Sequence, residues 1–541
     1  MASPEAAHDL IVVGAGINGA GVARDAAMRG LRVLLLDKGD LGGGTTSRST
    51  RLIHGGLRYL EHGEVGLVRE SLRERERLLW AAPHLVRPLP LVIPLYRGGR
   101  RGPLTIRAGM AAYDLLSLDK SLDRHRMLRR DEALALVPGL QSRDLLGAAR
   151  YHDAQAEYAE RLVVENVVSA ERHGAAVRTH TRVDGLLQEG GCVVGVRGTG
   201  ADGAFTARAP VVVNAGGPWI DAILAGTGEP RLGGGTKGSH IVVAPFPGAP
   251  AEALYVEARA DGRPFFVVPW NDLYLIGTTD LRHDGPLDGL APSEAEIAYL
   301  LAETDAVLPR AGLRRGDVLY GYAGVRPLPN SDGVSAGAIT RRHAVHDHGA
   351  AGGPQGLLTL VGGKLTTYRE LAEEAVDAAL RALGRPVAAS PTLSIPLPGG
   401  ELAGSTWDLF AASFPAESGL PERAARRLMR VYGTRALAVG ALATEPDLRE
   451  PFDPDSGAIG AEVVFAVREE GAVTLADILL RRTMVGLGPR CAVGADVAAA
   501  AVACRHLGWD AERAAAEVAA YRAELAPLLP RALGWGLDRP S

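Results

Sequence analysis

The hydrophobic pattern of the first forty residues predicts a strand, a helix and a second strand. The apolar run LIVV at residues 10–13 has the length and composition of a buried parallel strand. A glycine-rich turn follows it, and the next stretch of small and apolar residues ends at Gly30. The apolar run RVLLL then leads to Asp37. A unit of this kind is typical of a parallel, Rossmann-like sheet.

The turn after the first strand carries the pattern G-x-G-x-x-G at Gly14, Gly16 and Gly19. The first glycine permits a tight turn, the second lets backbone approach a pyrophosphate, and the third lets the helix pack on the strand. The N-terminus of the helix would direct N–H groups at the phosphates, and Asp37 stands where a carboxylate can hydrogen-bond ribose hydroxyls. The sequence therefore predicts a dinucleotide site, for a flavin or a nicotinamide cofactor.

Patterns further along the chain predict three kinds of structure. Strands that run into glycine turns recur at residues 205–217 and 357–380, whereas residues 263–280 alternate around the predicted hairpin turn WND. We expect an α/β protein with a Rossmann-like cofactor-binding domain, an antiparallel-β substrate cap and a mostly helical C-terminal domain. The expected segments are a core at 1–390 (cofactor-binding parts at about 9–80, 150–235 and 325–385, cap parts at about 85–149 and 236–324), a linker at 391–400 and the helical domain at 401–541.

Composition narrows the class of protein. With 541 residues, 47% of them hydrophobic and 23% charged, the chain predicts a soluble globular protein of two to four domains. A net charge of −4 gives no overall attraction to nucleic acid. Three cysteines without a CxxC pair predict a reducing compartment and no structural zinc or other metal site. We expect no signal peptide, and no apolar run approaches the ~18–20 residues that span a bilayer.

The stretch TSRSTRLIHGGLRYLEHGE, residues 46–64, concentrates arginine, histidine and hydroxyl side chains around a Gly-Gly pair. Its part RLIHGGLRYLE closely resembles the motif KLIHGGLRYLE of the FAD-dependent glycerol-3-phosphate dehydrogenases of the aerobic, quinone-linked type. Further blocks resemble the same family in the same order. They are VVVNAGGPWID (211–221), TKGSHIVV (236–243), FFVVPW (265–270), LIGTTD (275–280), GVRPL (324–328) and GGKLTTYRELAEEAVDAAL (362–380).

The resemblance implies an activity and its partners. Such an enzyme oxidises sn-glycerol 3-phosphate to dihydroxyacetone phosphate, with hydride transfer to flavin N5 of FAD and electrons passed to quinone. It also implies a homodimer that is cytoplasmic and peripheral at the inner face of the cell membrane, without nucleic acid as a partner. Basic stretches at residues 96–101 and 124–130, in the expected cap, could attract anionic lipid headgroups or be solvated surface.

Three residues are the expected catalytic groups. His54 is the leading candidate for the base that takes the hydroxyl proton, because neutral imidazole titrates near working pH. By resemblance Arg326 lies over the substrate, and the choice between His54 and Arg326 as proton acceptor stays open. Lys364, one of only four lysines, would raise the electron affinity of the flavin or bind phosphate.

The remaining candidates are assigned to substrate or cofactor. Arg58, Tyr59, Lys237 and Thr278 are expected to bind substrate, since a guanidinium or ammonium group suits a phosphate. The N-terminus of the helix after residue 367 would direct N–H groups at the flavin pyrimidine oxygen. The expected cofactor-binding residues are Gly14, Gly16, Asn18, Gly19, Asp37, Thr45, Ser47, Ser49, Val183, Gly216, Gly363, Leu365, Thr366 and Thr367.

Three alternative functions remain open, and the sequence departs from the family motif at one position. The related glycerol-3-phosphate oxidase uses oxygen, but the oxidases carry an extra insertion before the C-terminal domain that is not evident here. A related FAD amino-acid oxidase would need one arginine for a carboxylate, not a cationic cluster. A flavin-binding redox sensor or scaffold would lack the set His54, Arg326 and Lys364. Arg51 stands where the family usually has lysine, which puts any ammonium-specific role there in doubt.

Overall fold

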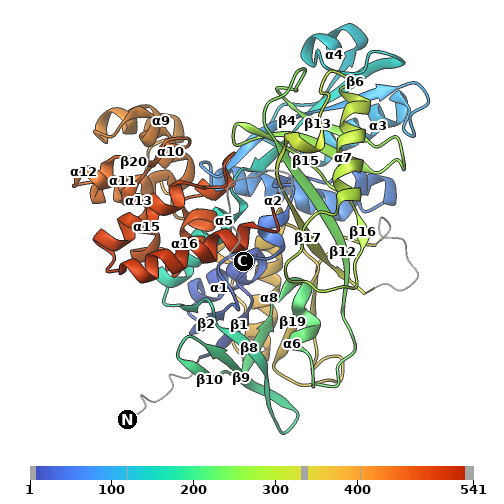
Figure 1. Ribbon diagram of the computed structural model, residues 1–541. Coiled ribbons are helices and arrows are strands. Elements are labelled where there is room, and N and C mark those ends of the chain that lie inside the picture. Colours follow the sequence, from blue (N-terminus) through green and yellow to red (C-terminus); the bar gives the residue numbers. More distant parts are fainter. Residues whose placement is uncertain (1–7, 119, 331–338, 403, 530–541) are drawn as a thin grey trace.

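The computed structural model describes residues 8–118, 120–330, 339–402 and 404–529. Its two large sheets adjoin, and the helices of the C-terminal domain lie on one flank of them (Figure 1). The smaller sheet has five parallel strands and one antiparallel edge strand. In spatial order these are β18 (Ala344–Asp347), β19 (Leu357–Val361), β11 (Val211–Asn214), β1 (Leu10–Val13), β2 (Val33–Leu36) and β7 (Ala176–Arg178).

Helices cover one face of this sheet and a small antiparallel sheet covers the other. The helices are α1 (Ile17–Met28), α5 (Ala159–Arg172) and α8 (Tyr368–Ala382), and the small sheet holds β8 (Arg182–Glu189), β9 (Cys192–Gly200) and β10 (Gly203–Arg208). The predicted strand–turn–helix unit is confirmed. A Cβ on Gly19 would lie 1.8 Å from the carbonyl oxygen of Gly14, so α1 packs on β1 only because this residue is glycine.

The second sheet has ten strands and forms most of the cap. They are β3 (Leu52–Ile53), β4 (Val86–Tyr96), β5 (Arg126–Arg129), β6 (Leu145–Ala156), β12 (Gly233–Val243), β13 (Ala253–Glu257), β14 (Pro264–Trp270), β15 (Leu273–Gly277), β16 (Leu281–Arg282) and β17 (Val318–Pro329). The predicted hairpin turn is confirmed between β14 and β15, where Asn271 and Asp272 have φ of +53° and +60°.

The cap sheet differs from the expectation in two respects. The sheet is mixed, because β13 runs parallel to β4 while the other described strand pairs of the sheet are antiparallel. It also contains β3 and β6, which pair with each other, so the boundary expected near residue 150 falls inside β6. The cap helices are α2 (Val65–Ala81), α3 (Pro103–Leu116), α4 (Arg130–Leu136) and α7 (Glu294–Val307).

The C-terminal domain is mostly helical, as expected. Its elements are α9 (Trp407–Glu417), α10 (Glu422–Tyr432), α11 (Ala436–Leu442), α12 (Pro446–Arg449), β20 (Pro451–Asp453), β21 (Ala458–Ile459), α13 (Gly460–Arg468), α14 (Leu475–Asp477), the π-helical turn η8 (Ile478–Arg482), α15 (Ala495–His506) and α16 (Ala511–Leu525). The segment expected as a linker is anchored. Arg24 donates to the carbonyls of Ile395 and Pro396, and Leu397 is fully buried.

In the part of the chain that the structure describes, no helix is both long and apolar enough to cross a bilayer.

Candidate functional site

Two adjoining cavities lie where the smaller sheet meets the cap sheet. The larger cavity has a volume of about 630 Å³ and begins at the glycine turn after β1. The smaller cavity has a volume of about 320 Å³ and extends between β12, β17 and the segment that follows β3. The residues that line both cavities are Thr45, Ser49, Pro327, Gly363, Lys364 and Leu365. A ligand that fills both would therefore pass between the two sheets.

The larger cavity is lined mainly by backbone turns and small side chains. Gly14 has φ of +106°, and a Cβ there would lie 2.5 Å from the carbonyl oxygen of Ala215. Gly16 opens α1, and a Cβ on it would meet only Thr46 Oγ1, at 3.6 Å. The Asp37 carboxylate accepts a hydrogen bond from the N–H of Ala15 at 2.6 Å. This arrangement places the N-terminus of α1 and the Asp37 side chain at the same cavity.

Two buried polar atoms at this cavity have no hydrogen-bond partner among the described residues. They are Asn18 Oδ1 and Trp219 Nε1. Buried polar groups are normally paired, so both atoms are free to bind a ligand in the cavity. Together with the cradle of glycines and the N-terminus of α1, they fit a dinucleotide cofactor.

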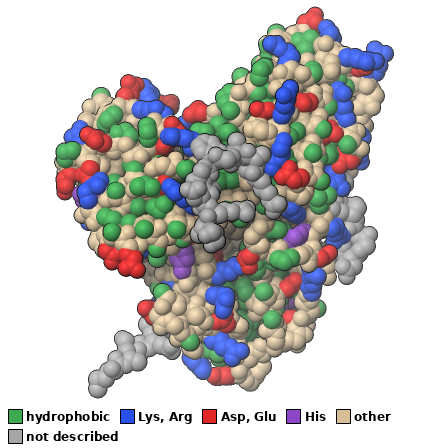
Figure 2. Space-filling model, in the orientation of Figure 1, with side chains coloured by type: hydrophobic (Ala, Val, Ile, Leu, Met, Phe, Trp, Pro, Cys, Tyr) green, Lys and Arg blue, Asp and Glu red, His purple; other side chains and the backbone are tan. Residues whose placement is uncertain are grey.

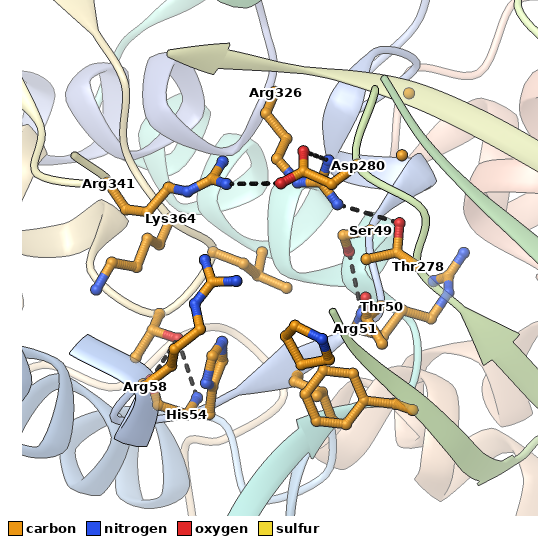
Figure 3. Close-up of a pocket in the computed structure, with 18 of the residues that line it drawn as sticks. Ser49, Thr50, Arg51, His54, Arg58, Thr278, Asp280, Arg326, Arg341 and Lys364 are labelled. Atoms are coloured by element: carbon orange, nitrogen blue, oxygen red, sulfur yellow. Dashed lines mark hydrogen bonds and ion pairs between the residues drawn. The ribbon is translucent and has the colours of Figure 1, made fainter. Parts of the chain in front are cut away.

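Arginines held by a carboxylate form one wall of the smaller cavity (Figure 3). Arg326, on β17, donates to Asp280 at 2.9 Å and to Thr278 Oγ1 at 3.1 Å. Arg341 donates to the other oxygen of Asp280 at 3.2 Å. Although burial alone would raise the pKa of Asp280, the two guanidinium groups hold it below its usual value. A Cβ on Gly238 would lie 2.5 Å from Arg326 Nη2, so this glycine makes room for the arginine.

Two further cations, Lys364 and Arg58, line the smaller cavity (Figure 3). Lys364 Nζ donates to Ser71 Oγ at 2.9 Å and lies 4.5 Å from the centre of the Tyr59 ring. Burial lowers the pKa of Lys364 to about 8. The Arg58 guanidinium lies 5.9 Å from the same ring. The ring of Tyr59 therefore lies near both Lys364 and Arg58, and both cations line the cavity.

Two histidines also line the smaller cavity, of which His54 is half-buried and His240 is buried. Burial lowers the pKa of His54 to about 4 and that of His240 to about 3, so both are neutral at pH 7. The backbone N–H of His54 donates to Thr366 Oγ1 at 3.1 Å, which ties this residue to the turn before α8. His240 Nε2 lies 2.8 Å from Thr50 Oγ1. A neutral imidazole can accept a proton from a substrate hydroxyl.

The structure brings most of the predicted site residues together. Those in the larger cavity are Gly14, Gly16, Asn18, Asp37, Thr45, Ser49, Val183, Gly216, Gly363 and Leu365, and those in the smaller cavity include His54, Arg58, Tyr59, Thr278, Arg326, Lys364 and Thr366. Four predicted residues line neither cavity. Gly19 packs α1 on β1, Ser47 donates to the carbonyl of Gly42, Thr367 stands at the N-cap position of α8 without a side-chain capping bond, and Lys237 pairs with Glu296 at 2.7 Å.

His240, Asp280 and Arg341 are among the residues of the smaller cavity that the sequence analysis does not predict. His240 and Asp280 lie inside the motifs TKGSHIVV and LIGTTD, so the motifs themselves were the signal. No motif marks Arg341. Arg51, which replaces the usual lysine, is fully buried and makes a two-pronged pair with Glu160 at 2.6 and 2.7 Å. At this position the guanidinium therefore holds α5 rather than a ligand.

Comparisons with known proteins agree with this architecture. Residues 9–369 match the family model of FAD dependent oxidoreductases, and residues 390–514 match that of the C-terminal domain of alpha-glycerophosphate oxidase. The chain is 47% identical to a glycerol-3-phosphate dehydrogenase of Synechocystis sp., covering 95% of this chain and 96% of the relative. It is 39% identical to a D-erythritol 1-phosphate dehydrogenase of Brucella abortus, covering 89% and 95%.

A solved structure is similar over nearly the whole chain. It is the glycerol-3-phosphate dehydrogenase of Bacillus halodurans complexed with FAD, with a TM-score of 0.79 and 26% identity, covering 97% of this chain and 95% of that one.

Proposed function

Because the chain belongs to the family of FAD-dependent glycerol-3-phosphate dehydrogenases, we propose that it oxidises sn-glycerol 3-phosphate to dihydroxyacetone phosphate and passes the electrons to a quinone. The observation that supports a phosphate ester as the substrate is the positive charge of the smaller cavity. Among the described residues that line it, Asp280 is the one carboxylate, and two guanidinium groups bind it. Apart from Arg51, which is paired with Glu160, the cations that line it are Arg48, Arg58, Arg263, Arg326, Arg341 and Lys364. Such a cluster suits a phosphate dianion better than the single carboxylate of an amino acid.

We assign to His54 the role of the base that accepts the proton of the substrate hydroxyl. His54 is neutral at pH 7 because of its burial, and it lies on the cavity beside Lys364 and Arg58. Arg326 remains a cation at neutral pH, since burial lowers its pKa only to about 10, so it stabilises the developing alkoxide rather than accepting the proton. When bound, FAD supplies the two-electron acceptor for the hydride of the substrate carbon. The ammonium of Lys364 favours the added negative charge of the reduced cofactor.

Features of the cap support contact with membrane lipid. Helix α3 exposes Leu104 and Leu115, and Leu118 just beyond it is also exposed, at 82%, 65% and 68% respectively. Figure 2 shows Lys and Arg side chains gathered over the tip of the cap, where α4 lies, close to the basic stretch 124–130. Apolar side chains next to cations suit the interface of an anionic bilayer. Sedimentation with phosphatidylglycerol vesicles, but not with phosphatidylcholine vesicles, would support this contact.

An anaerobic titration tests the substrate. Glycerol 3-phosphate should bleach the flavin absorption band of the purified protein, whereas glycerol and amino acids should not. D-erythritol 1-phosphate serves as the second phosphate ester, because a relative is named for it. If D-erythritol 1-phosphate bleaches the flavin much faster than glycerol 3-phosphate does, the proposed substrate is wrong. A flavin that stays oxidised throughout would favour a sensor or scaffold.

Reoxidation of the reduced protein tests the acceptor. A soluble quinone analogue should restore the flavin band within the turnover time, and air-saturated buffer should restore it much more slowly. Rapid reoxidation by air with release of peroxide would instead identify an oxidase.

A further inference from the structure

We propose that the C-terminal domain forms one wall of the FAD site and latches the loop that encloses the cofactor. Two of its residues, Arg481 and Glu524, line the larger cavity together with the glycine turn after β1. Arg481 Nη1 donates to Glu524 at 3.1 Å, so the two side chains form one continuous stretch of wall. FAD is therefore enclosed by residues that lie more than four hundred positions apart in the sequence.

The latch is a buried carboxylate on the cofactor loop. Asp40 follows Asp37 and precedes Thr45, both of which line the larger cavity. Its side chain is fully buried and is held by two consecutive arginines of the C-terminal domain. Arg481 Nε lies 2.6 Å from Asp40 Oδ2, and Arg482 binds both carboxylate oxygens, at 2.8 and 2.9 Å.

The local shape of η8 explains how both arginines reach one carboxylate. In a regular α-helix, consecutive side chains point about 100° apart and do not face a common partner. The wider π-helical turn Ile478–Arg482 directs both guanidinium groups at Asp40. π-Helical turns of this kind occur frequently at functional sites. Arg482 Nε also donates to the carbonyl of Glu470, which fixes the arginine from behind.

A second tie joins the same two parts of the molecule. His180 lines the larger cavity, and its Nε2 lies 3.0 Å from Asp477 Oδ2. The other oxygen of Asp477 accepts from Arg481 Nη2 at 3.0 Å. The cavity wall at His180, the cofactor loop at Asp40 and the turn η8 thus share one network of charges.

This network links cofactor binding to docking of the C-terminal domain. Removing one partner of a buried ion pair leaves an uncompensated charge, so Asp40 cannot leave the two arginines at low cost. While Asp40 is held, the loop that carries Thr45 and Ser49 stays closed against the cavity. The two equilibria, FAD binding and docking of the C-terminal domain, are thermodynamically linked. If docking strengthens FAD binding by some factor, FAD binding must favour docking by the same factor.

The test compares FAD affinity with stability in matched variants. Arg481→Gln and Arg482→Gln each weaken the latch, whereas Arg435→Gln is the control. Arg435 also joins the C-terminal domain to α5 through a buried ion pair, with Glu165 at 2.8 Å and Glu470 at 2.7 Å, but it lines neither cavity. FAD affinity is measured by titrating apoprotein with FAD, and melting temperatures are recorded with and without FAD.

The latch predicts that Kd for FAD rises at least about tenfold in both latch variants and changes less than about twofold in Arg435→Gln. The gain in melting temperature on adding FAD should also shrink only in the latch variants. If all three variants lower the melting temperature while Kd for FAD stays constant, the network is structural and the proposal is wrong.

A second measurement covers the case in which a glutamine variant does not fold. Hydrogen–deuterium exchange of the unaltered protein should slow on adding FAD in peptides that contain η8, and Arg482→Lys should reduce this protection. Exchange in η8 that does not respond to FAD would also overturn the proposal.

Discussion

The two cavities bind their ligands by different means. Apart from the wall formed by Arg481 and Glu524, the larger cavity is built from backbone at the glycine turn, where Gly14 approaches Ala215 and α1 begins. The smaller cavity is built from long charged side chains that converge from separate strands and loops, such as Arg326 and Lys364. A backbone-built site fails when an atom is added, because there is no room for it. A site of charged side chains fails when a charge is removed, because its partners are left unpaired.

The largest effect is expected at the backbone-built cavity. Gly14→Ala places a Cβ 2.5 Å from the Ala215 carbonyl at φ of +106°, so the turn between β1 and α1 must shift. We expect protein without flavin and a lowered melting temperature of the apoprotein. Gly16→Ala is the matched comparison, since its Cβ would meet only Thr46 Oγ1 at 3.6 Å. It should leave the apoprotein stability unchanged and lower only FAD affinity, as the ratio of flavin to protein absorbance will show.

The next largest effect separates the two histidines of the smaller cavity. Loss of a general base costs about 10²–10⁴-fold in rate, so His54→Gln should slow anaerobic flavin reduction by this factor. His240→Gln should slow it less, because His240 Nε2 is already engaged by Thr50. Stopped-flow reduction at saturating glycerol 3-phosphate measures both rates. A larger loss in His240→Gln would transfer the role of base to His240.

A pH profile tests the charged side chains without changing the cavity shape. kcat/KM reports the free enzyme, in which the pKa of His54 is about 4 and that of Lys364 is about 8. Below about pH 4 His54 becomes protonated and cannot accept a proton. Above about pH 8 Lys364 loses the charge that binds phosphate. Because the second pKa of a phosphate monoester is about 6, kcat/KM should rise as the substrate gains its second charge, level off between about pH 7 and 8, and fall roughly tenfold per pH unit on the alkaline side. The variant Lys364→Met should show no alkaline fall in kcat/KM. If the fall persists in this variant, a group other than Lys364 causes it.

The same contrast explains what the sequence could predict. Gly14, Gly16 and Asp37 act within one strand–turn–helix–strand unit, so their spacing alone indicates their place. The smaller cavity depends on the pairing register of β12 with its neighbouring strands. A local sequence pattern does not indicate that register. Side chains alternate between the faces of a strand, so Gly238 and His240 line the cavity while Lys237 points to Glu296 of α7. The motif around Lys237 was relevant, but the choice of residue within it required the paired strands.

The smallest effect is expected at Lys237. Its ammonium lies on Glu296, in a network that also contains Ser239 and Thr279, and it lines neither cavity. Lys237→Met should therefore lower the melting temperature by about 1–4 °C, as expected for loss of one partly buried ion pair. KM for glycerol 3-phosphate should change less than about twofold, because the phosphate would bind on the other face of β12. Arg326→Gln is the comparison, and it should raise KM or lower kcat by at least about 100-fold, since its charge lies in the cavity. If Lys237→Met instead raised KM tenfold at unchanged stability, Lys237 would have to reach the substrate, and the assignment of the two faces of β12 would be wrong.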